Sequence, residues 1–262
     1  MNVSRHALAT AATLTGLVVA SLPLGQSAAR AAAAPATGCA DIELLVSRGT
    51  SEPGTIGSLS VVADAITRGT NKTVVTFGNP YPASFSFASS TPAGVTELNQ
   101  ELAQQSAACP NQRFVLLGYS QGAIVAGDVL GGGSFSRSAP IGAAIGNKIV
   151  ATVMWGDPRF NSVEPFDAGT FAKGVNGTFA RPTGQLAAFD TRILDFCLGA
   201  DGVCQGNGAL RINAGHLSYP RNAAAIDAAA DFAIARINGT ATAAAPSAAP
   251  APRRHWWSRL FG

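Results

Sequence analysis

Short apolar runs alternate with helical stretches along the middle of this chain. The apolar runs cover residues 42–47, 72–77, 113–118, 148–155 and 191–196, and helical patterns cover 57–69, 90–109, 120–130 and 219–238. Strands that are apolar throughout are typical of a parallel sheet with helices on both faces. We therefore expect one doubly wound α/β domain from residue 37 to residue 238, with a mostly parallel five-stranded sheet.

Two of the expected helices carry end signals. Gly69 is expected to stop the first helix, because glycine readily adopts the left-handed conformation that ends helices. Thr91 is expected to cap the second helix, with Pro92 at its first position, where the missing N–H costs nothing.

The two ends differ from the domain in composition. Residues 1–36 have a basic start, an apolar run from about residue 7 to 22 and then small residues, which predicts a secretory signal peptide cleaved between about Ala29 and Ala36. A membrane anchor is the alternative, for which the apolar run is short. Residues 239–262 form an Ala/Pro linker and a basic-aromatic tail, "RRHWWSRLFG", which either contacts an anionic membrane or cell envelope or has no role.

Charge excludes one class of partner. Five of the 18 Lys and Arg residues lie near the two ends, so residues 37–238 hold 13 basic side chains against 15 acidic ones. The domain lacks the positive charge of a nucleic-acid-binding surface, and we expect no nucleic acid partner.

Export changes how the four cysteines are interpreted. Four cysteines in an oxidising compartment suggest two disulfides, with three possible pairings. Cys197 and Cys204 are seven residues apart around a short turn, so a local bond is the economical choice and leaves Cys39 to pair with Cys109. A zinc site is the rival, but no Cys-x-x-Cys or His-rich spacing supports it.

The stretch "RFVLLGYSQGAIVAGDVL" places Ser120 between Gly118 and Gly122, where an expected strand meets an expected helix. The Gly-x-Ser-x-Gly pattern in this context is typical of a strained turn that exposes a nucleophilic serine beyond the carboxyl end of a parallel strand. An ordinary tight turn of small residues is the alternative.

A serine nucleophile needs a base and an acid that orients the base. Of the three histidines, His6 lies in the signal and His255 in the tail, so His216 is the candidate base. It follows Ser120 in a loop-like segment before the last helix. The candidate acids between them are Asp128, Asp157, Glu164, Asp167, Asp190, Asp195 and Asp201. Asp201, inside the expected Cys197–Cys204 loop, is favoured over Asp157.

The segments "CADIELLVSRGTSEPG", "GYSQGA", "CLGADGVC" and "HLSYP" occur in an order that resembles the cutinases, serine esterases of the α/β-hydrolase fold. The resemblance runs from Cys39 to about residue 238. It implies a catalytic triad of Ser120, Asp201 and His216. It also implies the two disulfides Cys39–Cys109 and Cys197–Cys204.

The same resemblance assigns an oxyanion hole to Thr50 and the backbone N–H of Gln121. The latter assignment also makes physical sense, because this N–H opens a helix whose positive end faces the nucleophile. The resemblance further implies that Leu210, Ile212 and Leu217 line an apolar cleft for an acyl chain. Plain core packing would explain these three residues equally well, and Thr50 could be an ordinary turn residue.

The sequence therefore predicts a secreted, extracellular carboxylic-ester hydrolase of cutinase type, monomeric, with no metal and no organic cofactor. Its expected substrates are cutin, polyester or lipid esters. Two rivals remain: an acetylxylan or cell-envelope lipid esterase of the same family, and a catalytically silent envelope-binding protein.

Overall fold

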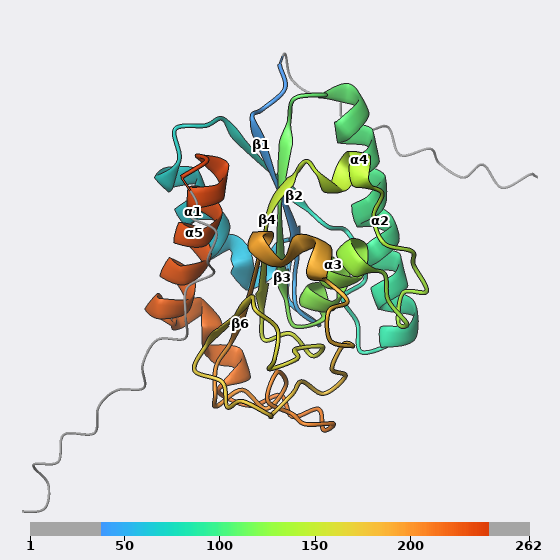
Figure 1. The fold of residues 1–262 in the computed structure, drawn as a ribbon, viewed down its shortest axis with the longest axis vertical. Helices are drawn as coiled ribbons and strands as arrows, with labels where there is room; N and C mark the ends of the chain where they lie inside the picture. The colour runs from blue at the N-terminus through green and yellow to red at the C-terminus, as the bar shows by residue number, and fades with distance from the viewer. Residues whose placement is uncertain (1–37, 241–262) are drawn as a thin grey trace, which may run out of the picture. The chain divides into compact units, whose positions relative to one another are not determined.

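The computed structural model describes residues 38–240, which form one sheet with helices on both faces (Figure 1). The expected signal peptide and the basic-aromatic tail lie outside the described residues. Within residues 38–240, no helix combines the length and the apolar character that crossing a bilayer requires.

The sheet has six parallel strands in the order β2-β1-β3-β4-β6-β5. The strands are β1 (Ile42–Ser47), β2 (Val74–Gly78), β3 (Arg113–Tyr119), β4 (Ile149–Trp155), β5 (Asp167–Gly169) and β6 (Ile193–Cys197). Every residue of β1 and β6 is buried, as expected for strands covered on both faces. The predicted fold class is confirmed. The sequence missed the edge strand β5, whose three residues are too few to form a recognisable apolar run.

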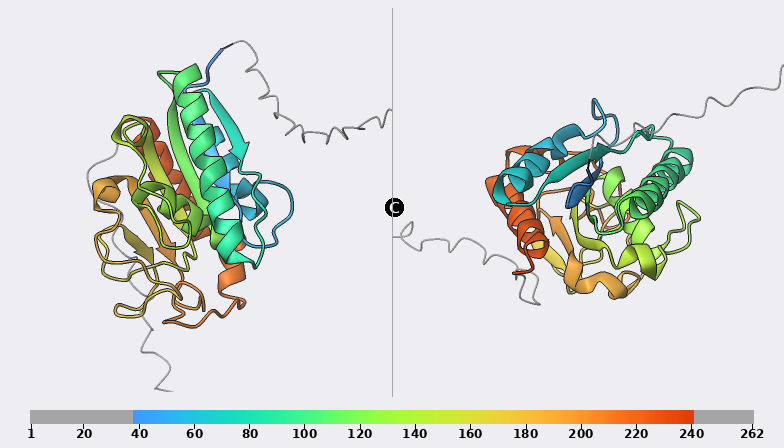
Figure 2. Two further views of the ribbon diagram at one scale, coloured as in Figure 1. Left: turned by 90° about the vertical axis from the view of Figure 1, so that its right-hand side faces the viewer. Right: turned by 90° about the horizontal axis from the view of Figure 1, so that it is seen from above.

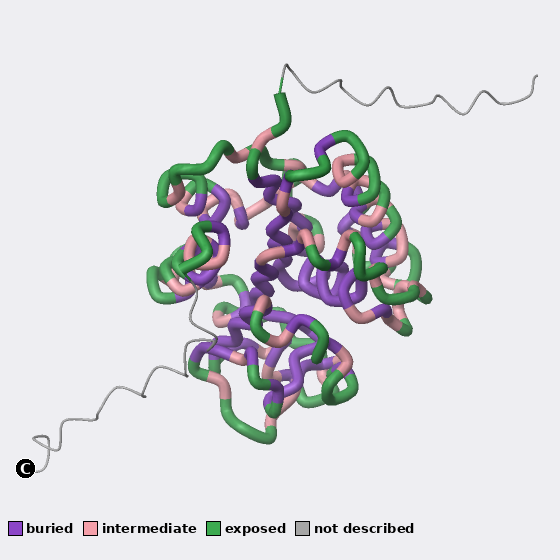
Figure 3. The backbone as a smooth tube through the Cα atoms, turned by 45° about the horizontal axis from the view of Figure 1, so that its top comes forward, coloured by how far each residue is buried: buried purple, intermediate pink, exposed green. Residues whose placement is uncertain are grey.

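Helices cover the two faces of the sheet in pairs (Figures 1 and 2). On one face α1 (Ser60–Gly69) packs beside α5 (Ala223–Ile237), and on the other α2 (Phe87–Ala108) packs beside α3 (Gln121–Gly131). The shorter helices are α4 (Ala143–Gly146) and the 3₁₀ helices η1 (Gly57–Leu59), η2 (Ala187–Arg192) and η3 (His216–Arg221). Each face buries its own apolar cluster against the strands, so buried residues run through the centre of the domain (Figure 3).

The start of α2 differs from the sequence prediction. The helix begins at Phe87, so Thr91 and Pro92 lie inside it and the predicted cap is wrong. The carbonyl of Ser86 accepts the N–H groups of Ser89 and Ser90, which starts the helix one turn earlier. The ring of Phe87 also packs edge-on against Phe179, 6.3 Å away between ring centres. This contact with a distant segment leaves no local signal in the sequence.

Two disulfides fasten the domain. Cys39–Cys109 joins the segment before β1 to the residue after α2, and Cys197–Cys204 closes a short loop after β6. In the chain-entropy account, the long loop contributes roughly 4 kcal/mol to stability and the short loop roughly 2 kcal/mol.

Candidate active site

The sheet order places the candidate site where the chain reverses its direction of winding. From β1 the chain first crosses to β2 at one side, and then returns to β3 on the other side of β1. Ligands of open α/β sheets bind in the crevice outside the strand ends at such a switch point. Ser47 pairs with Gly118, so the loop after β1 and the turn after β3 leave the sheet side by side. This topology brings Thr50 close to Ser120.

The turn at Ser120 is strained and crowded. Ser120 has φ 54° and ψ −118°, in the left-handed region that a residue with a side chain seldom occupies. A Cβ at Gly122 would lie 1.8 Å from the Ser47 carbonyl oxygen, and one at Gly118 would lie 2.5 Å from the Gly122 carbonyl oxygen. Backbone atoms lie too close to both positions for a side chain, so glycine is required on each side of the serine.

His216 lies near the C-terminal end of the domain sequence and contacts Ser120, 96 residues earlier in the chain. It is the first residue of η3 rather than part of an open loop, and its Nε2 lies 3.0 Å from Ser120 Oγ. The ring of Tyr119 stacks on the imidazole at 5.2 Å between centres, and its hydroxyl donates to the His216 carbonyl at 2.7 Å. The imidazole is thus held by packing on one face as well as by its polar partners.

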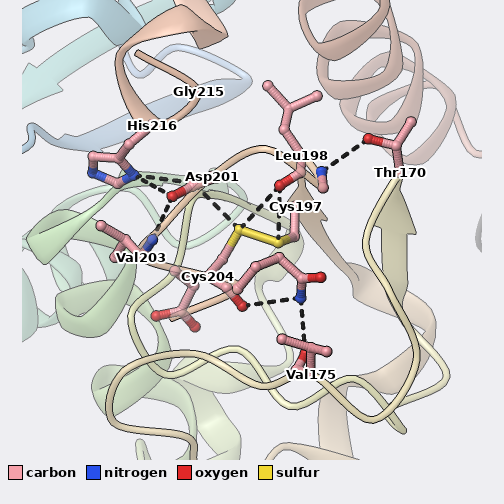
Figure 4. The surroundings of a disulfide bond; sticks show 12 residues. Thr170, Val175, Cys197, Leu198, Asp201, Val203, Cys204, Gly215 and His216 are labelled. Atoms are coloured by element: carbon pink, nitrogen blue, oxygen red, sulfur yellow. Dashed lines mark hydrogen bonds and ion pairs between the residues drawn. A yellow bond between two sulfur atoms is a disulfide. The ribbon is translucent and has the colours of Figure 1, made fainter. Parts of the chain in front are cut away.

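Asp201 bonds the other ring nitrogen of His216 and so completes a hydrogen-bonded chain from Ser120. Figure 4 shows the pair of Asp201 and His216. Both carboxylate oxygens lie 3.0 Å from His216 Nδ1. Oδ1 also accepts the Val203 N–H at 2.7 Å, and Oδ2 accepts the Tyr219 hydroxyl at 2.8 Å. The buried carboxylate therefore has a donor for each oxygen, which fixes its orientation toward the imidazole.

Asp157, the acid that the sequence analysis ranked second to Asp201, has a different partner. Its carboxylate forms a buried ion pair with Arg181, and its Oδ1 accepts the Arg159 N–H at 2.8 Å. Asp128 is likewise buried and pairs with Arg159. These carboxylates hold the loops after β4, whereas Asp201 faces the imidazole.

The short disulfide lies directly behind Asp201 (Figure 4). The Cys204 sulfur is 3.2 Å from Asp201 Oδ2 and 3.5 Å from the Tyr219 hydroxyl oxygen. The loop that carries the acid is therefore closed covalently within three residues of it. This closure limits how far the carboxylate can turn away from the imidazole.

The sequence analysis did not identify Tyr219 as a site residue. Its side chain is fully buried, and burial, together with the Asp201 carboxylate, raises the pKa of its phenol well above the ordinary value. The phenol thus remains a donor to Asp201 at any working pH. Tyr219 lies three residues after His216, one turn of a 3₁₀ helix, so the motif "HLSYP" contained a usable signal.

Thr50 and Gln121, the two residues expected to donate to an oxyanion, both lie beside Ser120: Thr50 lines the same cavity and Gln121 is the next residue in the chain. The Thr50 hydroxyl oxygen is buried and has no hydrogen-bond partner within residues 38–240, so it is free to donate to a ligand. The Gln121 N–H opens α3, and the first N–H groups of a helix lack partners within it. The side chain of Gln121 is occupied, since it accepts from Ser90 and donates to the Ser84 carbonyl.

We predict that Thr50→Val will slow ester hydrolysis by roughly 10²–10³-fold in kcat with little change in KM, because a donor that acts on the oxyanion contributes that much. Valine keeps the shape of threonine and removes the hydroxyl. Steady-state kinetics with a soluble p-nitrophenyl ester would measure the effect. An unchanged kcat would exclude an oxyanion role for this hydroxyl.

A cavity of about 150 Å³ opens beside Ser120 and His216. Its polar lining comes from Thr50, Glu52 and Ser58, and its apolar lining includes Ile212 and Leu217. Leu210 is not part of this lining within the described chain, although it is exposed nearby in the sequence. The cavity therefore has room for a small group beside the serine hydroxyl, with apolar side chains at its edge.

Comparison with known proteins places this site in a family. The profile of the Cutinase family matches residues 38–237. A cutinase of Kineococcus radiotolerans is 33% identical over 213 residues, which span 78% of this chain and 65% of that relative. The phospholipase Culp4 of Mycobacterium tuberculosis is 29% identical over 219 residues, 81% of this chain and 88% of the relative. The solved catalytic core of acetyl xylan esterase from Trichoderma reesei has a TM-score of 0.66 at 25% identity and covers 78% of this chain and 100% of that one. The chain therefore belongs to the cutinase family, a family of carboxylic-ester hydrolases.

Proposed function

We propose that this ester hydrolase works through an acyl-enzyme formed on Ser120, with His216 as the base and Asp201 as the acid that orients it. The observation that carries the proposal is the chain of contacts at 3.0 Å from Ser120 Oγ through His216 to the Asp201 carboxylate. Ser120 and His216 line the cavity, so a substrate carbonyl seated there lies beside the serine hydroxyl.

Each proton has a defined path in this mechanism. Ser120 Oγ attacks the carbonyl carbon while its proton passes to His216 Nε2, and the resulting oxyanion accepts the Thr50 O–H and the Gln121 N–H. The intermediate then expels the alcohol, which takes the proton from His216. Water, deprotonated by His216, hydrolyses the acyl-enzyme in the same way. Because the base must be neutral to accept a proton, hydrolysis is expected to fall in acid.

The substrates we propose are lipid or polyester esters with an aliphatic acyl chain. The support is the exposed apolar rim of the site, where the exposed fractions are 45% for Ile212 and 52% for Leu217. Exposed apolar side chains next to a reactive group favour a substrate that covers them. Acetyl esters of a polysaccharide are the second candidate, because the cavity of about 150 Å³ holds an acetyl group and the acetyl xylan esterase core shares the fold.

A series of p-nitrophenyl esters with acyl chains of two to sixteen carbons separates the two substrate classes. We expect kcat/KM to rise by at least about 10-fold from acetate to chains of four to eight carbons, since each buried methylene contributes about 0.8 kcal/mol and two together contribute about 1.6 kcal/mol. Turnover of a polyester film or a lipid emulsion would support the first class. A sharp preference for acetate, together with deacetylation of acetylxylan, would reject it.

We further propose that the protein is exported, with residues 1–36 as the signal peptide and residues 37–238 as the catalytic domain. The two disulfides support this, since such bonds persist in oxidising compartments. Contact of the basic-aromatic tail with a membrane or cell envelope remains part of this proposal.

A further inference from the structure

Glu52 is a carboxylate inside the active-site cavity that the proposed mechanism does not use. It lies in the loop after β1, two residues beyond Thr50, and lines the same cavity as Ser120 and His216. Burial raises the pKa of its carboxyl, which would be a cost without compensating contacts. The contacts of a carboxyl group kept beside a nucleophile against this cost indicate what it does there.

The contacts of Glu52 close the loop that presents Thr50. Oε2 accepts the Gly49 N–H at 2.7 Å, and Oε1 accepts the N–H of Ser58 at 3.2 Å and also its hydroxyl. The Glu52 N–H in turn donates to the Gly49 carbonyl at 3.2 Å. The carboxylate therefore joins the residue before Thr50 to the start of η1 and fixes the turn between them.

The backbone leaves room for this carboxylate. Gly57 has φ 53°, and a Cβ there would lie 2.3 Å from Glu52 Oε2. A Cβ at Gly49 would meet the same oxygen at 3.3 Å and the Tyr119 ring at 2.8 Å. A side chain at either position would displace the carboxylate or the loop, so the position of Glu52 is built into the fold.

Arg48 and His216 are the basic side chains near the Glu52 carboxylate. Arg48 and His216 both act to lower its pKa, opposing the effect of burial. The guanidinium of Arg48, however, donates to backbone carbonyls, at 3.0 Å to that of Glu52 and 2.9 Å to that of Tyr81, and lies over the Tyr81 ring. The imidazole of His216 is therefore the basic group on the cavity side, where positive charge develops when Ser120 is deprotonated.

Four ionisable groups face His216 from the elements around it. Asp201 follows β6 and bonds Nδ1, Tyr119 at the end of β3 stacks on the ring, Tyr219 lies on η3, and Glu52 lies after β1. Burial raises the pKa of both tyrosines, so they are neutral. Within residues 38–240, the carboxyl groups around the imidazole are thus those of Asp201, bonded to Nδ1, and Glu52, in the same cavity.

We propose that Glu52 is a positioning residue of this hydrolase, whose carboxylate holds the Thr50 turn ready for the oxyanion and stabilises the imidazolium that forms when Ser120 attacks. This inference rests on the proposed triad. Attack of the serine makes a negative oxyanion and a positive imidazolium together. Glu52 acts on the first through the loop that it ties and on the second through its charge.

Two variants separate the two effects. Glu52→Gln keeps the size of the side chain but removes the carboxylate. A single amide oxygen then replaces the two oxygens that accept hydrogen bonds from Gly49 and Ser58. We expect kcat to fall about 10–100-fold with KM little changed. We also expect the acid limb of kcat/KM to move to lower pH by about 0.5–1 unit. The shift has this sign because a negative charge near a base stabilises its protonated form, and Glu52→Gln removes that charge.

Glu52→Asp keeps the charge but is one methylene too short to reach both Gly49 and Ser58. Its kcat is expected to fall by about 10-fold or more, with the acid limb within about 0.2 pH units of the parent. Glu97→Gln on α2, outside the site, is the matched control and should leave both kcat and the acid limb unchanged. Thermal unfolding of all variants checks that the fold is retained.

The outcomes are distinct. A parent-like kcat in Glu52→Gln, or an equal loss in both variants without any movement of the acid limb, would overturn the proposal. If Glu52→Gln does not fold, the pH profile of Glu52→Asp is the test. This variant keeps the carboxylate, so a shift of its acid limb would contradict the proposal that the charge of Glu52 sets that limb. Labelling of Ser120 by a phosphonate in the parent protein tests the triad separately, so failure of the triad and failure of the Glu52 role can be told apart.

Discussion

Replacing Ser120 by alanine is expected to lower kcat by at least about 10⁴-fold and toward 10⁶-fold, since the nucleophile of such a triad cannot be bypassed. The change removes one oxygen atom. Alanine is no larger than serine and tolerates the backbone at φ 54° as well as serine does, so the fold should remain. Hydrolysis of a p-nitrophenyl ester under saturating conditions would measure the loss.

Covalent labelling gives a second measure of the same prediction. A phosphonate probe should add once to the parent protein and not at all to Ser120→Ala. Ser218→Ala is the matched control, because Ser218 lies two residues from His216 and its hydroxyl donates to the Gly215 carbonyl at 2.7 Å rather than to the imidazole. Persistence of the label in Ser120→Ala, or its loss in Ser218→Ala, would show that another group is the nucleophile.

Asp201→Asn is expected to lower kcat by about 10⁴-fold through the wrong tautomer of His216. The asparagine oxygen would take the place of Oδ1, because the Val203 N–H at 2.7 Å needs an acceptor there. The NH₂ group would then replace Oδ2 and donate to His216 Nδ1. That bond places the imidazole proton on Nε2, which can no longer accept the proton of Ser120.

Asp195→Asn is a matched control for this variant. Asp195 is also buried, on β6, and burial raises the pKa of its carboxyl well above the ordinary value. The same substitution there should leave kcat within about threefold of the parent, as expected for a site away from the chemistry. A loss of less than about 10-fold in Asp201→Asn, with the fold intact by thermal unfolding, would contradict the role given to Asp201.

Much of the fold followed from local patterns in the sequence. Buried parallel strands are mostly apolar without alternation, so β1, β3, β4 and β6 could be recognised from their short apolar runs. The edge strand β5 could not, because its three residues include Asp167 and Gly169 and its pairing depends on β6. The start of α2 was wrong for a similar reason, since the ring contact of Phe87 with Phe179 spans distant segments.

The sequence by itself determined the parallel sheet, the strained turn at Ser120 and the choice of His216, because periodicity, glycine spacing and a count of histidines are local or compositional properties. Only the tertiary structure showed that Asp201 rather than Asp157 faces the imidazole. It also showed that Glu52 lines the cavity beside Ser120 and that the Tyr219 hydroxyl donates to Asp201. The orientation of a buried carboxylate depends on which donors the fold brings to it, and those donors come from segments far apart in the chain.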